Sequence, residues 1–382
     1  DIQADLWTEL AKARLGLDDV AGMQAALERA LRLAPGHEGA LLTHAQGLLR
    51  QRKHVEALVV ASKVVELYPQ SANAWFLLGS SYHAQGDLER AAMHYRRARE
   101  IDPLLGRAAL GEATVLMAAQ QPEQAAEVLA GLRVSHPYSM ESHYYHAVAL
   151  RKLGRSADAA KALDAASDLV SRVAPADLND PAHLHLAATI KSENGEYESA
   201  FGFLARYLQF RPDDLSANKQ LARLHLSLNR PTEASRLLTR LKNKNPGDPE
   251  LLVMLGDVNT DLHDFEVAER YYEAAQEYLR ASPELVRLIG LTQYRQGDAD
   301  SAVETLRRFI EEHPGDNAES SILLARLYLR EGRLAEAVQL VDGLVSVQPD
   351  NLAARDLQAV AAISGNDRKR GRELLQAVLD QD

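Results

Sequence analysis

The stretch "WFLLGSSYHAQGDLERAAMHYRRAREIDP", residues 75–103, places large residues, small residues and one proline at spacings that suggest a helical hairpin. Its proline, Pro103, belongs to a series of four prolines that lie 34 residues apart, namely Pro35, Pro69, Pro103 and Pro137. A fixed period of this length is typical of a solenoid made of stacked supersecondary units. The stretch is therefore one copy of a repeat that recurs along the chain.

The proline series continues toward the end of the chain with one irregular interval. Its later members are Pro212, Pro246, Pro314 and Pro349. Between Pro137 and Pro212 there are 75 residues, which is two periods of 34 plus seven. We therefore predict a seven-residue insertion near "LVSRVAPAD", residues 169–177.

Two further series of small residues follow the same phase. Small side chains at matched positions let two antiparallel helices approach closely, while a larger residue three positions before the first series packs into the adjacent helix. A hairpin of two helices explains both series. The first series is Ala11, Ala45, Gly79, Ala113, Ala147, Ala188, Ala222, Gly256, Gly290, Ala325 and Ala359. The second series is Ala57, Ala91, Ala125, Ala159, Ala200, Ala234, Ala268, Ala302 and Ala337.

Turn-forming residues between the two apolar segments of each repeat agree with a helical hairpin. Glycine permits the left-handed backbone that ends a helix, and an aspartate after it, such as Asp87 or Asp298, can cap the next helix. The glycines at these turns are Gly86, Gly195, Gly297 and Gly332. Because no segment shows the alternation of a β-strand, the sequence predicts an all-α protein.

Composition narrows the class of partner. The 382 residues include 43 Lys and Arg against 54 Asp and Glu, which gives a net charge of −11. This balance argues against nucleic-acid binding and against a polybasic membrane surface. The chain has no cysteine, and no apolar run approaches the length of a transmembrane segment. It begins at Asp1 without a signal peptide, which indicates a processed product or an excised fragment.

The quoted hairpin resembles the tetratricopeptide repeat (TPR) at each characteristic position. The matching residues are Trp75, Leu78, Gly79, Tyr82, Gly86, Ala91, Tyr95, Ala98 and Pro103. The resemblance covers nearly the whole chain as about eleven repeats, and Gly371 replaces the second small residue in the last one. It implies an α-solenoid, a right-handed superhelix whose concave face is lined by the first helix of each repeat.

We expect one solenoid over residues 1–382. The approximate repeats are 3–36, 37–70, 71–104, 105–138, 139–179 with the insertion, 180–213, 214–247, 248–281, 282–315, 316–350 and 351–382.

Within this family, the chain is similar to the long TPR proteins of bacterial exopolysaccharide loci, especially those of the PEP-CTERM/exosortase system. The segments that carry this similarity are residues 217–258, 291–306 and 323–351. It implies a protein-protein interaction scaffold for polysaccharide synthase or export components, with a periplasmic or envelope location favoured over the cytoplasm. A general bacterial TPR adaptor and the TPR arm of a larger enzyme are the alternatives.

No motif for catalysis, for a cofactor or for nucleotide phosphates is present, so we expect no enzyme activity. One histidine cluster requires a choice between metal binding and packing: His136, His143, His146, His183 and His185. His143 and His146 occupy positions filled by Trp75 and Leu78 in the third repeat. Packing is therefore favoured over a metal site. The same argument assigns Trp7, Trp75, Tyr82, Tyr95, Tyr271 and Tyr272 to packing.

The resemblance assigns the second, fifth, ninth, twelfth and thirteenth positions of each repeat to the concave groove, counted so that Trp75 is fourth. The candidate partner-binding residues are Phe76, His83, Tyr144, Arg151, Lys152, Lys219, Arg223, Asp257, Asp261, Arg287, Tyr294, Arg295, Arg326 and Arg330. Because Lys219 is followed by Arg223 at the ninth position, where co-chaperone TPR clamps have asparagine, a clamp for heat-shock protein C termini is not expected.

Four of these candidates form a basic cluster in an acidic protein: Arg287, Arg295, Arg326 and Arg330. Guanidinium groups bind carboxylates through paired hydrogen bonds, which suits an acidic peptide or an anionic polysaccharide. The competing interpretation is a solvated face that Glu284 and Glu319 neutralise.

Overall fold

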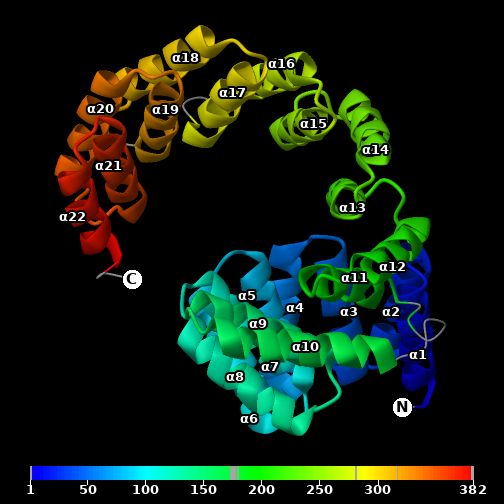
Figure 1. The fold of residues 1–382 in the computed structure, drawn as a ribbon. Helices are drawn as coiled ribbons and strands as arrows, with labels where there is room; N and C mark the ends of the chain where they lie inside the picture. Colours follow the sequence, from blue (N-terminus) through cyan, green and yellow to red (C-terminus); the bar gives the residue numbers. More distant parts are fainter. Residues whose placement is uncertain (1, 173–177, 179, 280–281, 316, 380–382) are drawn as a thin grey trace. The chain divides into compact units, whose positions relative to one another are not determined.

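The computed structural model describes residues 2–172, 178, 180–279, 282–315 and 317–379. Every regular element in these ranges is an α-helix, and the helices follow one another as hairpins (Figure 1). The predicted all-α class is therefore confirmed. Among the described residues, no helix combines the length and apolar character that crossing a bilayer requires.

The chain divides into two compact bodies, Asp1–Phe203 and Leu204–Asp382, which we call the N-terminal and C-terminal bodies. The first contains α1 (Ile2–Gly16), α2 (Val20–Leu33), α3 (Glu38–Arg50), α4 (His54–Leu67), α5 (Ala72–Ala84), α6 (Leu88–Ile101), α7 (Gly106–Ala118), α8 (Pro122–Ser135), α9 (Met140–Lys152), α10 (Ser156–Arg172) and α11 (Pro181–Glu193). The division falls within α12 (Tyr197–Phe210). The expectation of one continuous solenoid stays a prediction.

The C-terminal body contains the remaining helices. These are α13 (Leu215–Ser227), α14 (Pro231–Lys244), α15 (Pro249–Asp261), α16 (Phe265–Gln276), α17 (Pro283–Arg295), α18 (Ala299–Glu312), α19 (Ala318–Arg330), α20 (Leu334–Val347), α21 (Leu352–Ser364) and α22 (Arg368–Leu379). Odd-numbered helices are the first helices of their repeats and even-numbered helices are the second. In both bodies, we count positions from the first residue of the first helix, so that Ala72 is position 1; in the first repeat, where α1 starts two residues earlier, Ala4 is position 1.

The turn inside each hairpin has one left-handed residue at position 15. Four predicted turn glycines, Gly86, Gly195, Gly297 and Gly332, have φ between 74° and 89°, and Gly154 has φ 72°. The other hairpins place non-glycine residues there with φ between 55° and 68°, namely Asp18, Arg52, Gln120, Asn229, His263 and Asn366. Each hairpin thus has a residue with left-handed backbone at position 15. A residue other than glycine carries some strain in this conformation.

First helices begin at polar caps that follow the proline turns. The side chains of Ser71, Ser139, Asp214 and Asp248 each accept a hydrogen bond from a backbone N–H in the first turn. These bonds satisfy donors that the helix start leaves without an intrahelical partner. The caps fix where each first helix starts and therefore which side chains share a face.

A large side chain at position 24 covers the small residue at position 8 of the same hairpin. A Cβ built on Gly256 would lie 2.3 Å from Cε1 of Tyr272, and one built on Gly290 would lie 2.9 Å from Cγ of Leu306. The ring of Tyr95 meets two glycines, since a Cβ at Gly79 or at Gly111 would lie 2.8 Å from it. Glycine at these positions is required by the close approach of the second helix.

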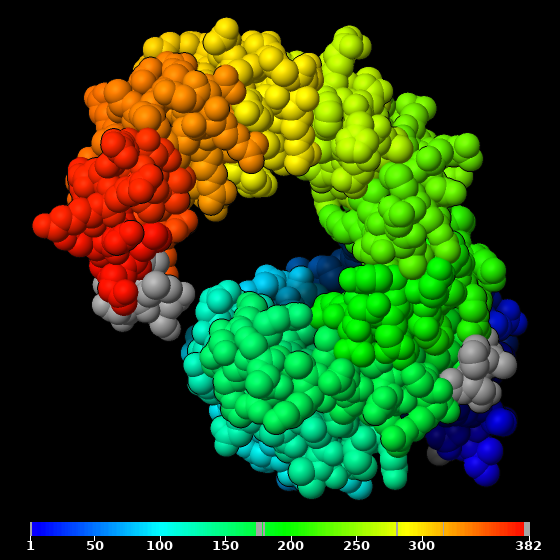
Figure 2. Space-filling model, viewed as in Figure 1, coloured from blue at the N-terminus to red at the C-terminus, as the bar shows by residue number. Residues whose placement is uncertain are grey.

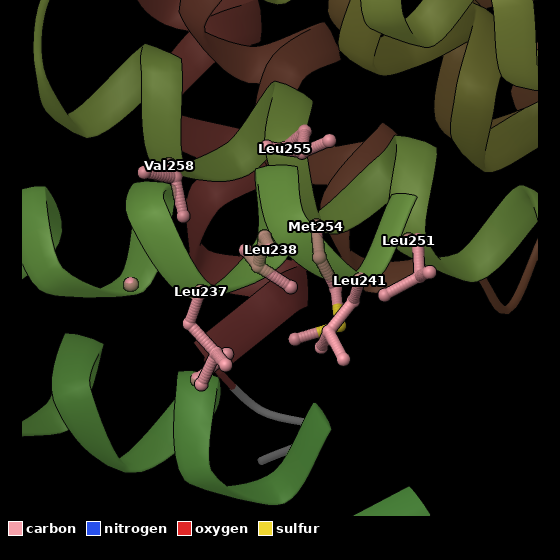
Figure 3. Packing of buried hydrophobic residues seen from close by; sticks show 9 residues of the cluster. Leu237, Leu238, Leu241, Leu251, Met254, Leu255 and Val258 are labelled. Carbon is pink, nitrogen blue, oxygen red and sulfur yellow. The ribbon is translucent and has the colours of Figure 1, made fainter. Parts of the chain in front are cut away.

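Cores form between consecutive hairpins as well as within them. Figure 3 shows one such cluster, in which leucines of α14 meet apolar side chains of α15. Its members include Leu237, Leu238, Leu241, Leu251, Met254, Leu255 and Val258. Because each hairpin buries its apolar face only against its neighbours, the stacking supplies the stability that one hairpin lacks.

The predicted insertion lies partly outside the described residues, which omit 173–177 and 179. The helix before it, α10, has 17 residues, three more than α8 with 14. Across this region the buried Lys191 of α11 donates hydrogen bonds of 2.7 Å to Ser167 and Ser171 of α10. Its third bond, also 2.7 Å, goes to Glu196. A polar cluster thus joins the two helices.

The Glu196 carboxylate is held in its ionised form by this cluster. Burial raises its pKa, but hydrogen bonds from Lys191, Ser167 and Asn194 outweigh burial and lower the pKa to about 2. A carboxylate with a lowered pKa contributes stability above its ordinary pKa, near 4.5, and this contribution is lost as the pH falls toward 2.

We predict that Gly256→Ala destabilises the chain by about 1–3 kcal/mol through overpacking against Tyr272. Urea unfolding followed by circular dichroism measures this cost. Tyr272→Leu recreates the pairing of alanine with leucine that Ala222 and Leu238 provide, so in that background the cost should largely disappear. The control is Gly131→Ala on α8, where no atom lies within 4 Å of the added Cβ. An equal effect of Gly256→Ala in both backgrounds would contradict the contact.

We predict that Glu196→Gln lowers the free energy of unfolding at pH 7 by about 1 kcal/mol, the range for partly exposed charged groups. The difference from wild type should shrink as the pH falls from about 4.5 toward 2, because wild type then loses the same charge. Glu127→Gln, at an exposed site on α8, is the control. A difference that grows on acidification would refute the assignment.

Candidate functional site

The first helices of the C-terminal body present one common face. Figure 1 shows α15, α17 and α19 along the inner side of a curved row and α16, α18 and α20 along its outer side. Figure 2 shows the yellow and orange part of this row as a continuous surface. Positions 2, 5, 9, 12 and 13 of these helices make up what we call the inner face.

The basic candidates of α13 are already paired with two acidic side chains at the start of α15. Lys219 is 8% exposed, and its Nζ lies 2.7 Å from Asp248 Oδ2 and 2.7 Å from Glu250 Oε2. Arg223 donates to the other oxygen of Glu250. Lys219 therefore serves the stacking of α13 on α15, a role that inspection of its own repeat does not reveal.

Electrostatics at this cluster favour the charged forms. Burial lowers the pKa of Lys219, but hydrogen bonds to Asp248 and Glu250 give a net increase. Burial raises the pKa of Asp248, while its hydrogen bond from Lys219 makes the net shift downward. Asp248 is also the N-cap of α15, accepting from Leu251 N–H at 3.1 Å. One carboxylate thus caps a helix and holds the neighbouring hairpin.

Among the residues that the structure describes, no cationic side chain forms an ion pair with the acidic candidates of α15. Asp257 is half-buried and accepts a hydrogen bond of 2.8 Å from the hydroxyl of Tyr272. Burial raises its pKa, and Asp261 raises it further. Asp261 is exposed one turn later. Asp257 therefore contributes to packing as well as to the inner face.

The basic cluster separates into one paired arginine and three free ones. Arg287 is bonded to Glu284, with Nε 3.1 Å from Oε2, and lies 3.8 Å from Glu319. In the part of the chain that the structure describes, no carboxylate lies within ion-pair distance of the other three, which are Arg295, Arg326 and Arg330. These three side chains are exposed. Neutralisation by glutamates therefore accounts for Arg287 alone.

An aromatic ring adjoins the free arginines. The guanidinium carbon of Arg330 lies 5.9 Å from the ring centre of Tyr294, within the range of a cation–π contact. Arg326 lies one turn before Arg330 on α19, and Arg295 follows Tyr294 on α17. The structure thus brings side chains of two adjacent repeats onto one surface.

The candidates of the N-terminal body form two smaller groups. In the first, the guanidinium of Arg107 lies 4.6 Å from the ring centre of Phe76. His83 contacts Tyr95 edge to face at 6.4 Å, and burial lowers its pKa. The sequence interpretation missed Arg107, although it occupies position 2 of the fourth repeat.

In the second group of the N-terminal body, one carboxylate joins two of the candidate residues. The Glu193 carboxylate accepts hydrogen bonds of 2.8 Å from Tyr144 and 2.9 Å from Arg151. Burial, followed by the contact with Glu193, raises the pKa of Tyr144. Lys152 is exposed beside them. Glu193, at position 13 of the sixth repeat, was also missed, because its partners lie 42 and 49 residues away.

The histidine cluster serves packing and hydrogen bonding at separate places. His143 Nε2 lies 3.1 Å from the carbonyl oxygen of Pro137. At the same position 4, Trp75 and Asn218 donate to Pro69 and Pro212 at 2.9 Å and 3.0 Å. His143 therefore makes the same contact as Trp75, a hydrogen bond to the carbonyl oxygen of the proline six residues earlier.

The other histidines have partners of their own. His146 Nδ1 lies 2.8 Å from the guanidinium of Arg133, and burial together with Arg133 lowers its pKa to about 4. His183 lies 3.1 Å from Glu141. Within the described residues, no group of three or more His, Asp or Glu side chains has an arrangement that could hold a metal ion.

The predicted packing role of the aromatic residues is confirmed. Tyr95 and Tyr272 are 3% and 1% exposed. Trp75 is half-buried and stacks on His94 with ring centres 5.4 Å apart. Trp7, Tyr82 and Tyr271 are also half-buried, beside the apolar clusters of their repeats.

Part of the chain is similar in sequence to a known protein. A curated relative, cellulose synthase operon protein C of Pseudomonas fluorescens (strain SBW25), is 25% identical over 183 residues. This match covers 45% of the present chain but only 14% of the relative. The chain therefore spans a small part of the length of that relative.

Several solved structures are also similar to the chain, with TM-scores below 0.5. The yeast Tom70 structure has a TM-score of 0.47 and 15% identity, covering 96% of this chain and 90% of that one. A MamA protein structure has a TM-score of 0.39 and 18% identity, covering 44% of this chain and 93% of that one. A tetratricopeptide repeat protein from Parabacteroides merdae ATCC 43184 has a TM-score of 0.38 and 14% identity, covering 77% and 100%.

Two family models, both described as tetratricopeptide repeat, match the chain. One matches residues 192–257 and 293–361, and the other matches 42–105 and 110–171. Together they cover more than half of the sequence, in agreement with the helix pairs and with the small residues at positions 8 and 20. The chain belongs to the tetratricopeptide repeat family.

Proposed function

We propose that the chain is a non-catalytic scaffold that helps assemble a bacterial envelope machine for exopolysaccharide synthesis and export. Tetratricopeptide repeats provide surfaces for protein-protein interaction. The relative named cellulose synthase operon protein C, which is 25% identical over 183 residues, supports a polysaccharide system. We accordingly place the chain in the envelope or periplasm.

The observation that carries the proposal is the contrast between the free and the paired cations of the inner face. Lys219, Arg223 and Arg287 have carboxylate partners within the chain. Arg295, Arg326 and Arg330 are exposed and have none among the described residues. Exposed arginines on one face of an acidic protein are suited to an anionic partner brought in from outside.

The chemistry of the ligand follows from the guanidinium groups and the adjoining ring. Guanidinium binds carboxylate through two parallel hydrogen bonds, and Tyr294 adds a flat apolar surface. An acidic segment of a protein partner satisfies both. An anionic polysaccharide presents the same carboxylates, so the shared ligand chemistry is a series of carboxylates along an extended chain.

We predict that Arg326→Glu with Arg330→Glu abolishes capture of a polysaccharide synthase or export component from solubilised envelope of the source cells. The reason is that reversed charges repel a carboxylate ligand. Mass spectrometry of the captured proteins, beside a cytosolic fraction, measures this. Circular dichroism should show an unchanged fold, since both side chains are exposed.

The matched control reverses Arg236 and Arg240 on α14. They are also two exposed arginines four residues apart, but they lie on a second helix. This control should capture the same partners as wild type. Recovery of unrelated cytosolic proteins would favour a general adaptor, and capture that ignores the Arg326 and Arg330 reversal would remove the inner face from the proposal. A catalytic domain fused to the chain in the source cells would favour the arm of an enzyme.

A further inference from the structure

One contact recurs between the first helices of consecutive repeats, from position 5 of one helix to position 2 of the next. Between α13 and α15 it joins Lys219 to Glu250, with Nζ and Oε2 2.7 Å apart. Between α17 and α19 it joins Arg287 to Glu319, with Nε and Oε2 3.8 Å apart. In both places a cation at position 5 meets a carboxylate at position 2, and the two charges offset each other.

The same two positions hold a different pair between α5 and α7. Phe76 is at position 5 of α5, and Arg107 is at position 2 of α7. The guanidinium carbon of Arg107 lies 4.6 Å from the ring centre of Phe76. A cation thus takes the position of the glutamate, and a ring takes the position of the cation. This contact contains a positive charge and no negative one.

Arg107 has no carboxylate partner in the part of the chain that the structure describes. Its side chain is exposed, yet burial lowers its pKa and no carboxylate offsets that shift. Two other arginines that lie over rings, Arg90 and Arg333, are each 4.5 Å from the ring centre. They are paired with Asp87 and Glu336. A partly desolvated cation without such a partner favours an anion brought in from outside.

Neighbouring side chains hold Arg107 and add to the site. The Arg107 guanidinium donates a hydrogen bond to Asn73 Oδ1. The amide N–H groups of Asn73 have no partner among the described residues and remain available as donors. The half-buried ring of Phe76 packs on Tyr95, with ring centres 5.6 Å apart. The site therefore combines a guanidinium, an amide donor and part of an aromatic ring, and α5 contains no acidic residue.

The charge and composition of the site define the ligand. A single guanidinium matches the single charge of a carboxylate, which it binds through parallel hydrogen bonds. The accessible part of Phe76 gives an apolar surface beside that charge. A peptide segment with a carboxylate next to an apolar side chain supplies both groups. An anionic polysaccharide supplies carboxylates without an apolar side chain.

We propose that Arg107, Asn73 and Phe76 form a carboxylate-binding site for a peptide segment of a protein partner. The bound carboxylate takes the role at Arg107 that Glu250 and Glu319 have in the other stacks. The apolar side chain beside that carboxylate contacts Phe76. This site lies within the N-terminal body and does not use the free arginines of α17 and α19, so it does not depend on the function proposed above.

N-acetylphenylalanine is the probe, because its carboxylate adjoins a phenyl side chain, and its C-terminal amide is the uncharged match. The Nε–H nuclear magnetic resonance signal of Arg107 in the full chain, prepared with isotopically labelled arginine, reports binding at this site alone. Its absence from the spectrum of Arg107→Lys identifies it. The acid should shift this signal with a dissociation constant on the order of 1 mM, and the amide should bind about 10-fold more weakly or worse.

Asn73→Asp supplies the missing carboxylate from within the chain, at the atom that already accepts from Arg107 and with almost no change in shape. It should weaken binding of the acid by about 10-fold or more, since two carboxylates then compete for one guanidinium. The matched control is Arg90→Gln, because Arg90 also lies over a ring but has Asp87 as its partner. This control, and the reversal of Arg326 and Arg330, should leave binding as in wild type.

Three results would overturn the proposal: no response of the Arg107 signal to the acid, an equal response to the acid and the amide, or undiminished binding to Asn73→Asp. Weakened binding in Arg90→Gln would likewise contradict the assignment to Arg107. A glucuronate oligomer that shifts the Arg107 signal more than the acid does, at equal carboxylate concentration, would overturn the assignment to a peptide.

Discussion

In each hairpin, the side chain at position 24 packs on the small residue at position 8. The spacing of the two helices, and with it the arrangement of the other side chains, depends on this contact. Where Tyr272 lies on Gly256, or Tyr95 on Gly79, no Cβ fits between the helices. The second helix is thereby drawn against the first, and the large ring is buried without a cavity. Alanine at position 8 accompanies a smaller partner, such as Leu238 opposite Ala222. The pair of side chains at positions 8 and 24 thus differs between hairpins, but in each of these hairpins it fills the space between the two helices.

Fixing this contact also fixes which side chains remain available for other roles. Once position 8 faces the second helix, position 9 follows it by about 100° around the helix and reaches the inner face. Arg223, Asp257 and Arg326 all occupy position 9. Some of these charges then join neighbouring hairpins, as Arg223 does with Glu250. Those without internal partners, such as Arg326, are left for other molecules.

Sequence reasoning predicted the features that depend on local spacing. The helix pairs, the glycine turns and the packing role of Tyr95 and Tyr272 follow from residues within one period and are confirmed. The sequence did not reveal that Lys219 is buried against Asp248, because this pairing joins side chains 29 residues apart on different hairpins. It also did not predict His263 in the left-handed turn, where the fold imposes a conformation that histidine adopts less readily than glycine. The partner-binding role of the inner face stays a prediction.

The most direct test of this account is the reactivity of single cysteines at adjacent positions 8 and 9. The native chain contains no cysteine, so each variant reports one site. We predict that Ala325→Cys reacts with a maleimide on the order of 100-fold more slowly than Arg326→Cys, because a buried site reacts only through local opening. The pair Ala222→Cys and Arg223→Cys should behave alike in the seventh repeat. Equal or reversed rates within either pair would contradict the register on which the inner face depends.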